Sequence, residues 1–170
     1  MKFKFVAAIA MALAIGACSS NNDQSASGGT PQAADRTDRQ QVSTAQPGPS
    51  YAPGSQEELN ATIGDRVFFG FDRYDLTQEA RATVGFWADW MKTHQNVSLM
   101  IEGHADERGT REYNLALGAR RANAVRDYLT ALGVSASRVR TVSYGKERPA
   151  VLGSNEQAWA QNRRAVAVVQ

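Results

Sequence analysis

The sequence is poor in several features that would point to a particular class of protein. It holds a single cysteine among 170 residues, so it can form neither an intramolecular disulfide nor a cysteine-based zinc site. Its charges nearly balance, with 19 Lys and Arg against 17 Asp and Glu. Two of the lysines stand at the extreme N-terminus, and removing a leader that ends at Ala17 leaves 19 − 2 = 17 basic against 17 acidic groups. A basic surface for nucleic acid is therefore not expected.

The first 17 residues have the build of a secretory signal peptide. Two lysines precede an apolar run at 5–15, which is too short to span a bilayer. Residues 15–18 read IGAC, which resembles the lipobox of bacterial lipoproteins. We therefore predict cleavage after Ala17 and lipidation of Cys18, with a diacylglyceryl group on the thiol and an acyl chain on the new amine. Ser19, in place of the aspartate that resembles an inner-membrane retention signal, favours anchoring in the outer membrane.

The lipidated cysteine and a flexible tether are predicted for residues 18–54. Val42 and Tyr51 are the only large apolar residues there, in a background of Ser, Gln, Asn, Gly, Pro and Ala. Such a segment cannot bury enough surface to offset the entropy lost on ordering. Its root-mean-square span would be on the order of 30 Å, so a cysteine fixed in the membrane could serve a domain working at a distance.

Residues 55–170 are predicted to form one α/β domain. Alternating apolar residues indicate strands, and apolar residues at helical spacing indicate helices. Strands are expected at 67–71, 97–103, 139–144 and 165–169, helices at 55–62, 77–91 and 111–132, and a helical turn at 156–162. The core-facing side of the long helix is expected at Leu115, Gly118, Ala122, Val125, Leu129 and Leu132. This order predicts an α+β sandwich in which helices pack on one mixed sheet of about four strands.

The densest polar chemistry lies at 102–110, between the second strand and the long helix. A strand end beside a helix N-terminus is a natural ligand site. Asn114, Leu117 and Arg121 follow at helical spacing, so one helix face carries them toward this loop. Asp72 follows the first strand and could close the site from a neighbouring strand end.

Two interpretations of these charges remain open from spacing alone. Asp106 and Arg121 could simply form a salt bridge. Alternatively, Asp106 and Asp72 would attract an ammonium group while Arg121 takes a carboxylate through a bidentate fork, assisted by the helix N-terminus. Diaminopimelate, the crosslinking amino acid of many Gram-negative cell walls, presents both groups at its free end.

Several segments resemble the OmpA-like peptidoglycan-binding domain, and in particular the peptidoglycan-associated lipoproteins that carry it. The resembling segments are 69–72 (FGFD), 103–110 (GHADERGT), 113–114 (YN), 117–122 (LGARRA), 142–149 (VSYGKERP) and 162–165 (NRRA). The lipobox and tether fit the same family, so the resemblance covers the whole chain. It implies an OmpA-like fold and binding of peptidoglycan.

The resemblance also implies site residues and partners. The family's diaminopimelate contacts fall on Asp72, Asp106, Arg108, Thr110, Leu117 and Arg121, and Asn114 matches a motif residue that shapes the loop. The implied partners are peptidoglycan, the outer membrane through the lipid, and TolB with the other Tol proteins, together with other outer-membrane proteins. TolB would compete with the wall for an overlapping surface, and the system draws the outer membrane inward at division.

Two other functions compete with this interpretation. An enzyme is disfavoured, because His94 and His104 are the only histidines and Ser143 lies in no nucleophile-elbow pattern. We therefore expect no catalysis, and no cofactor other than the covalent lipid. A scaffold that binds Tol proteins but not the wall is excluded only by the resemblance. Measuring how variants of Asp106 and Arg121 bind isolated wall sacculi would distinguish such a scaffold from a wall-binding protein.

Overall fold

The structure is a computed structural model and describes residues 50–170. The predicted leader, Cys18 and the predicted tether up to residue 49 lie outside the described residues, and the domain boundary stays a prediction. The described elements are, in order, α1 (Gln56–Thr62), β1 (Arg66–Phe68), α2 (Gln78–Thr93), β2 (Leu99–His104), α3 (Arg111–Ala131), a 3₁₀ turn (Ala136–Arg138), β3 (Val139–Gly145), α4 (Glu156–Asn162) and β4 (Arg164–Val169). Not one of these helices combines the length and hydrophobicity needed to cross a membrane.

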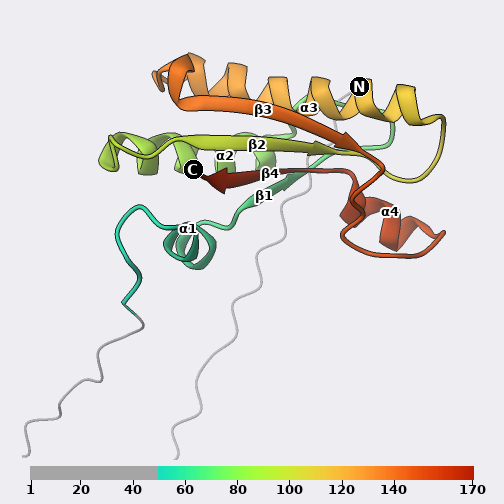
Figure 1. Ribbon diagram of the computed structural model, residues 1–170, viewed down its shortest axis with the longest axis horizontal. Coiled ribbons are helices and arrows are strands. Elements are labelled where there is room, and N and C mark those ends of the chain that lie inside the picture. Colours follow the sequence, from blue (N-terminus) through green and yellow to red (C-terminus); the bar gives the residue numbers. More distant parts are fainter. Residues whose placement is uncertain (1–49) are drawn as a thin grey trace, which may run out of the picture. The chain divides into compact units, whose positions relative to one another are not determined.

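The four strands form one mixed sheet in the order β1-β4-β2-β3. β2 and β3 run parallel and are connected through α3, whereas β4 runs antiparallel to both β1 and β2. Figure 1 shows α2 and α3 together behind the sheet, with α1 and α4 at its two ends. The expected architecture, helices packed on one mixed sheet of four strands, is confirmed.

The core lies between the sheet and the two long helices. The apolar residues at helical spacing along α2 are buried, with Ala80 at 4% exposure and Val84, Trp87 and Met91 at 0%. In α3 the predicted side is correct from Gly118 to Leu129 and wrong at its start, because Leu115 is 41% exposed whereas Leu117 is buried. The second turn of α3 therefore directs its apolar side chain, that of Leu117, toward the loop after β2 and not toward the main core.

Two glycines allow α3 to lie unusually close to the sheet. A Cβ added to Gly103 of β2 would come within 1.9 Å of the carbonyl oxygen of Gly118 of α3. A Cβ on Gly118 would lie 2.3 Å from Oγ of Ser143 on β3. Because glycine has no side chain, the helix backbone rests directly on the strand, and the N-terminal half of α3 is held beside the C-terminal end of β2.

The first strand is shorter than predicted. It ends at Phe68. Phe69 stays buried and donates its N–H to the Arg163 carbonyl at 2.9 Å, and the turn that follows leaves Phe71 60% exposed. Asp72 adopts a left-handed backbone with φ of 55°, which a continuing strand would not allow. The other boundary errors are one or two residues: the second strand begins at Leu99 and not at Val97, and the third extends to Gly145.

Candidate functional site

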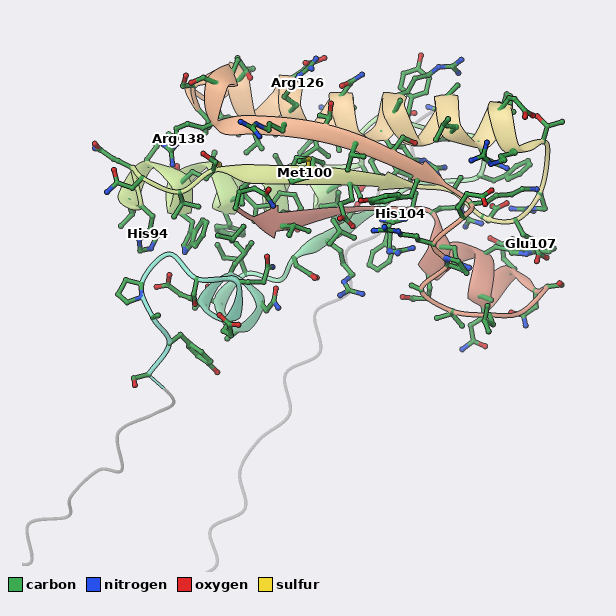
Figure 2. The ribbon with its side chains drawn as sticks, in the orientation of Figure 1. His94, Met100, His104, Glu107, Arg126 and Arg138 are labelled. Carbon is green, nitrogen blue, oxygen red and sulfur yellow. The ribbon has the colours of Figure 1, made fainter. Side chains whose placement is uncertain are left out.

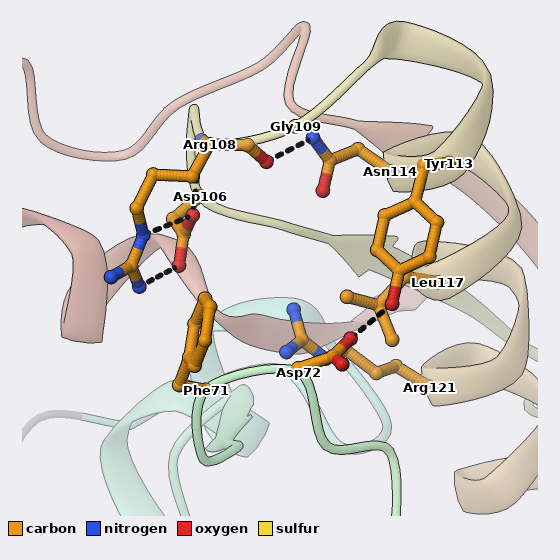
Figure 3. Close-up of a pocket in the computed structure, with 9 residues that line it drawn as sticks. All are labelled: Phe71, Asp72, Asp106, Arg108, Gly109, Tyr113, Asn114, Leu117 and Arg121. Carbon is orange, nitrogen blue, oxygen red and sulfur yellow. Dashed lines mark hydrogen bonds and ion pairs between the residues drawn. The ribbon is translucent and has the colours of Figure 1, made fainter.

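Three chain segments meet at the C-terminal end of β2 and enclose a pocket. They are the turn after β1, the loop between β2 and α3, and the first three turns of α3. The pocket encloses about 480 Å³, part of it open to solvent, and is lined by Phe71, Asp72, Asp106, Arg108, Gly109, Tyr113, Asn114, Leu117 and Arg121 (Figure 3). Segments up to 50 residues apart in sequence thus supply one concave site.

Six of the seven residues predicted to bind ligand line this pocket: Asp72, Asp106, Arg108, Asn114, Leu117 and Arg121. The seventh, Thr110, is the N-cap of α3, and its Oγ accepts a hydrogen bond from the backbone N–H of Tyr113 at 3.2 Å. Thr110 therefore fixes where the helix begins. Whether any of the seven contacts a ligand stays a prediction.

Asp106 is held by Arg108 of the same loop. Nε and Nη2 of Arg108 donate to the two carboxylate oxygens at 3.0 and 2.7 Å, and the backbone N–H of Arg108 donates to Oδ1 at 3.1 Å. Burial alone would raise the pKa of the Asp106 carboxyl, but these hydrogen bonds and the charges of Arg108 and Arg163 hold it below its ordinary value. Asp106 is therefore ionised at neutral pH although it is only 5% exposed.

The Arg108 guanidinium lies between two aromatic rings. Its central carbon is 4.1 Å from the ring centroid of Phe71 and 4.0 Å from that of Trp159 on α4. Nε1 of Trp159 in turn donates to Glu107 at 3.0 Å. Cation–π contacts on both sides restrict the guanidinium, so α4 supports the loop although it supplies no pocket-lining residue.

Asp72 lies across the pocket from Asp106 and is exposed. The hydroxyl of Tyr113 donates a hydrogen bond to its carboxylate, and this bond to Asp72 is the main cause of the raised pKa of Tyr113. Asp72 forms no ion pair with a cation of residues 50–170. Its remaining acceptor capacity therefore faces the solvent-filled pocket.

Arg121 is completely buried, and its guanidinium binds backbone carbonyls. Nε donates to Arg73 O at 2.8 Å, Nη1 to His104 O at 2.7 Å and Nη2 to Gly70 O at 3.2 Å. Desolvation lowers its pKa to about 10, so it remains cationic. Figure 3 shows the guanidinium at the base of the pocket, between the side chains of Phe71 and Asp72.

The simple salt bridge between Asp106 and Arg121 does not form. The ion pairs of Asp106 in residues 50–170 are to Arg108 and, at 3.6 Å, to Arg163. A guanidinium has five N–H donors. In Arg121, three of them each bind one backbone carbonyl. Two N–H groups of Arg121 therefore make no hydrogen bond within residues 50–170.

Asn114 and Leu117 complete the helix side of the pocket. Nδ2 of Asn114 donates to the backbone oxygen of Arg108 at 2.8 Å, which fixes the loop to the helix, as the motif resemblance implied. Leu117 is 5% exposed and gives the floor an apolar patch. Lys146 also stabilises the loop, because its Nζ donates hydrogen bonds to the carbonyls of Glu107 and Gly109 at 3.1 and 2.7 Å.

Sequence reasoning missed several residues at the site. Tyr113 was quoted only as part of a motif, although it precedes Leu117 and Arg121 at intervals of four and so shares their helix face. Phe71 was assigned to a strand, and Trp159 was given no role at the site. Arg163 entered the sequence analysis only as part of the segment 162–165, but it is 7% exposed and its Nη1 lies 3.6 Å from Oδ2 of Asp106.

The arrangement suits recognition of a small ligand with both charges. Two carboxylates and two guanidiniums surround one pocket whose floor and walls carry Leu117, Phe71 and the Tyr113 ring. No group of three or more His, Cys, Asp and Glu side chains in residues 50–170 is placed to hold a metal ion. Ser143 donates its hydroxyl to the Leu115 carbonyl at 2.7 Å, so no catalytic base activates it.

Comparison with known proteins identifies relatives along the chain. Residues 68–163 match the OmpA family. The peptidoglycan-associated lipoprotein of Rhizobium meliloti is 53% identical over 117 residues, covering 69% of this chain and 66% of that protein, just under two thirds of its length. The protein of the same description from Haemophilus influenzae is 40% identical over 166 residues, covering 96% of this chain and 97% of that protein.

Solved structures agree with this fold. The crystal structure of the peptidoglycan-associated lipoprotein from Burkholderia pseudomallei is 47% identical with a TM-score of 0.61, covering 62% of this chain and 90% of that chain. The C-terminal domain of Helicobacter pylori MotB is only 19% identical, with a TM-score of 0.56 over 62% of this chain and 84% of that one. The latter similarity concerns the fold alone.

Proposed function

This chain belongs to the OmpA family and, within it, to the peptidoglycan-associated lipoproteins, and we propose that it is an outer-membrane lipoprotein whose domain binds peptidoglycan without covalent attachment. The ligand would be the diaminopimelate of the stem peptide. The observation that carries this proposal is the pocket between Asp72, Asp106 and Arg121, in which opposite charges lie apart around an apolar floor.

In the proposed complex each charge of the diaminopimelate tip has a partner. Its carboxylate would accept hydrogen bonds from the two remaining N–H groups of Arg121. Its ammonium would donate hydrogen bonds to the carboxylates of Asp72 and Asp106. Three hydrogen bonds already occupy Asp106, and a carboxylate offers about four acceptor sites. One position on Asp106 is therefore left for the ammonium without displacing Arg108.

The position of the chain's entry into the domain suits an anchor. A Cβ on Gly54 would lie 2.9 Å from Val97, just before β2, whereas the pocket lies beyond the other end of β2. Figure 2 places His94 near the first of these ends and Glu107 near the second. Six residues of strand separate the two points by about 20 Å, so a lipid on Cys18 and a wall bound at the pocket would load opposite ends of the domain.

The resemblance leads us to propose Tol proteins as further partners. TolB would bind a surface that overlaps the wall site, so that wall-bound and TolB-bound forms exclude each other, and the system would support outer-membrane invagination at division and envelope integrity. In a competition experiment, purified TolB should release the domain from wall sacculi in proportion to its concentration. Release that is absent at saturating TolB would remove this part of the proposal.

We propose no catalytic activity. The relatives are named as lipoproteins and not as enzymes, and His104 is buried with neither ring nitrogen hydrogen-bonded, which leaves no accessible histidine base at the pocket. Incubating the domain with purified sacculi should release no muropeptides detectable by chromatography. Release that is lost in an Asp106→Asn variant would contradict the proposal.

The test of wall binding is co-sedimentation of residues 50–170 with sacculi whose stem peptides contain diaminopimelate. Wild type should sediment with the wall. Asp72→Asn should weaken binding with little effect on folding, because Asp72 is exposed and its side chain has one hydrogen-bond partner within residues 50–170, Tyr113. The matched control is Asp127→Asn, an exposed aspartate of α3 paired with neighbouring Arg126. Equal sedimentation of all three proteins would rule out the proposed site.

A further inference from the structure

Arg163 lies where α4 ends and β4 begins, beneath the pocket. It is the C-cap residue of α4, and its side chain is 8% exposed. It does not line the pocket. A buried guanidinium is costly to desolvate, so its contacts indicate what the cation does.

The guanidinium of Arg163 joins three chain segments. Nε donates to the carbonyl of Phe69 at 3.1 Å, Nη2 donates to Oε1 of Glu156 at 2.7 Å, and Nη1 lies 3.6 Å from Oδ2 of Asp106. The backbone adds a fourth contact, because the Phe69 N–H donates to the Arg163 carbonyl at 2.9 Å. The turn after β1, the loop after β2 and α4 thus meet on one side chain.

Each of these segments carries or supports part of the site. Phe69 immediately precedes the turn that carries Phe71 and Asp72. The carbonyl of the next residue, Gly70, accepts a hydrogen bond from Arg121. Glu156 also lies 3.9 Å from Arg108. Two buried arginines therefore hold successive carbonyls of a turn that has no regular secondary structure beyond Phe68.

The Nη1 atom of Arg163 has no hydrogen-bond partner although it is buried. A buried donor without a hydrogen-bond partner reduces the free energy of unfolding. The position of Nη1 is therefore not explained by a contribution to stability. It is directed at the carboxylate that the ligand's ammonium would share. Its charge therefore acts on Oδ2 of Asp106, the oxygen that Nη2 of Arg108 also binds.

We propose that Arg163 is a positioning residue of the peptidoglycan site, which holds the Phe71–Asp72 turn and the Asp106 carboxylate in the geometry that the diaminopimelate tip requires. This inference rests on the proposed function. Arg163 does not touch the ligand and acts through Asp106 and the turn. Replacing Arg163 should therefore weaken ligand binding more than replacing an equally buried arginine that reduces the free energy of unfolding by a similar amount.

Arg164 supplies a matched control. It is the next residue and is equally buried, at 7% exposure, and it too donates to carbonyls, those of Asn162 and Arg148. Neither of those residues lines the pocket. Arg163→Met and Arg164→Met should both reduce the free energy of unfolding, whereas only the first should weaken binding.

The experiment is calorimetric titration of residues 50–170 with the tripeptide L-Ala-γ-D-Glu-meso-diaminopimelate, at a temperature where each variant is folded by circular dichroism. Arg163→Met should bind at least about tenfold more weakly than wild type, and Arg164→Met within about twofold. Arg163→Lys retains the charge but not the fork, so its affinity should lie between those of wild type and Arg163→Met. It also provides a folded variant if methionine is not tolerated.

Amide chemical shifts give a readout that a general loss of stability would not move. In the Arg163 variants the amides of Phe71, Asp72 and Arg108 should shift, and those of α2 should not. Wild-type affinity in Arg163→Met or Arg163→Lys, or an equal loss in Arg164→Met, would overturn the inference. Failure of wild type to bind the tripeptide would instead refute the proposed function, and unshifted amides at Phe71 and Asp72 would then refute the positioning role separately.

Discussion

The carbonyl oxygen of Gly118 on α3 lies directly against the α-carbon of Gly103 on β2, with no room for a side chain between them. This contact sets the height of α3 above the sheet. It therefore also sets how far Arg121, which lies almost one turn further along the helix, reaches toward the carbonyl of His104.

Gly103→Ala should destabilise the domain by about 3 kcal/mol, because its Cβ would overlap backbone and not a movable side chain. Gly85→Ala is the control: Gly85 lies in α2 with nothing within 4 Å of an added Cβ, so alanine should stabilise by roughly 1 kcal/mol through helix propensity. Urea unfolding measures both changes. Similar stabilities of the two variants would contradict the close approach of α3 to the sheet.

Replacing Arg121 should affect folding as well as binding. Arg121→Ala removes the side-chain donor to the carbonyls of Arg73, His104 and Gly70, of which Gly70 keeps its hydrogen bond from Arg73 N–H. This loss should cost about 3 kcal/mol. Arg126→Ala, at a half-buried position of the same helix whose guanidinium pairs with the exposed Asp127, should cost less than about 0.5 kcal/mol. Thermal unfolding of the two variants distinguishes them, and equal melting temperatures would contradict the buried role of Arg121.

His104 should make the domain less stable as the pH falls. Its side chain is buried, and desolvation, followed by the charges of Arg164 and Arg148, lowers its pKa from 6.5 to about 4. Between these values the unfolded chain binds the proton and the folded protein does not. Stability due to the neutral imidazole is therefore complete above pH 6.5 and is lost as the pH falls toward 4, by up to about 1.4 kcal/mol per pH unit.

Urea unfolding between pH 4 and 7 tests this pH dependence. The slope of the free energy of unfolding against pH should be smaller in His104→Gln than in wild type, because glutamine does not titrate. Other groups contribute equally to both proteins, so the difference isolates His104. Parallel curves for the two proteins would show that the imidazole titrates normally in the folded state.

Trp159 should support binding through Arg108 and contribute little to folding. Trp159→Leu removes one of the two rings that stack on the Arg108 guanidinium, and a contact of this kind contributes about 1 kcal/mol. Affinity for the diaminopimelate tripeptide should fall severalfold. Phe86→Leu is the control, since Phe86 is 61% exposed on α2 and lies outside the pocket lining. A fall of the same size in Phe86→Leu would contradict the role of Trp159.

The order of the elements and the face of α3 that bears the site could be read from the sequence because both are local patterns. Helical spacing places Asn114, Leu117 and Arg121 on one side whatever the rest of the chain does. The end of β1 could not be read in this way. FGFD continues an apolar run. Its turn is closed by a local hydrogen bond from Arg73 N–H to Gly70 O, and Arg121 and Arg163, 51 and 94 residues away from their partners, bind the carbonyls of Gly70 and Phe69.

The pairing of charges was the least predictable part of the site. Spacing brings Asp106 near Arg121, but Arg108 is two residues away and reaches the carboxylate first. Burial then decides what Arg121 does: an arginine at 0% exposure must satisfy its donors, and backbone carbonyls are the nearest acceptors. Patterns in the sequence carry neither effect, because both depend on the final packing of three separated segments.

The central claim is that the pocket recognises both charges of one amino-acid tip, and titration calorimetry with three matched tripeptides tests it most directly. The first ends in meso-diaminopimelate, the second in the same residue with its distal carboxylate amidated, and the third in L-lysine, which lacks that carboxylate. We predict clear binding of the first and at least about tenfold weaker binding of the other two. Equal affinity for all three would contradict the account.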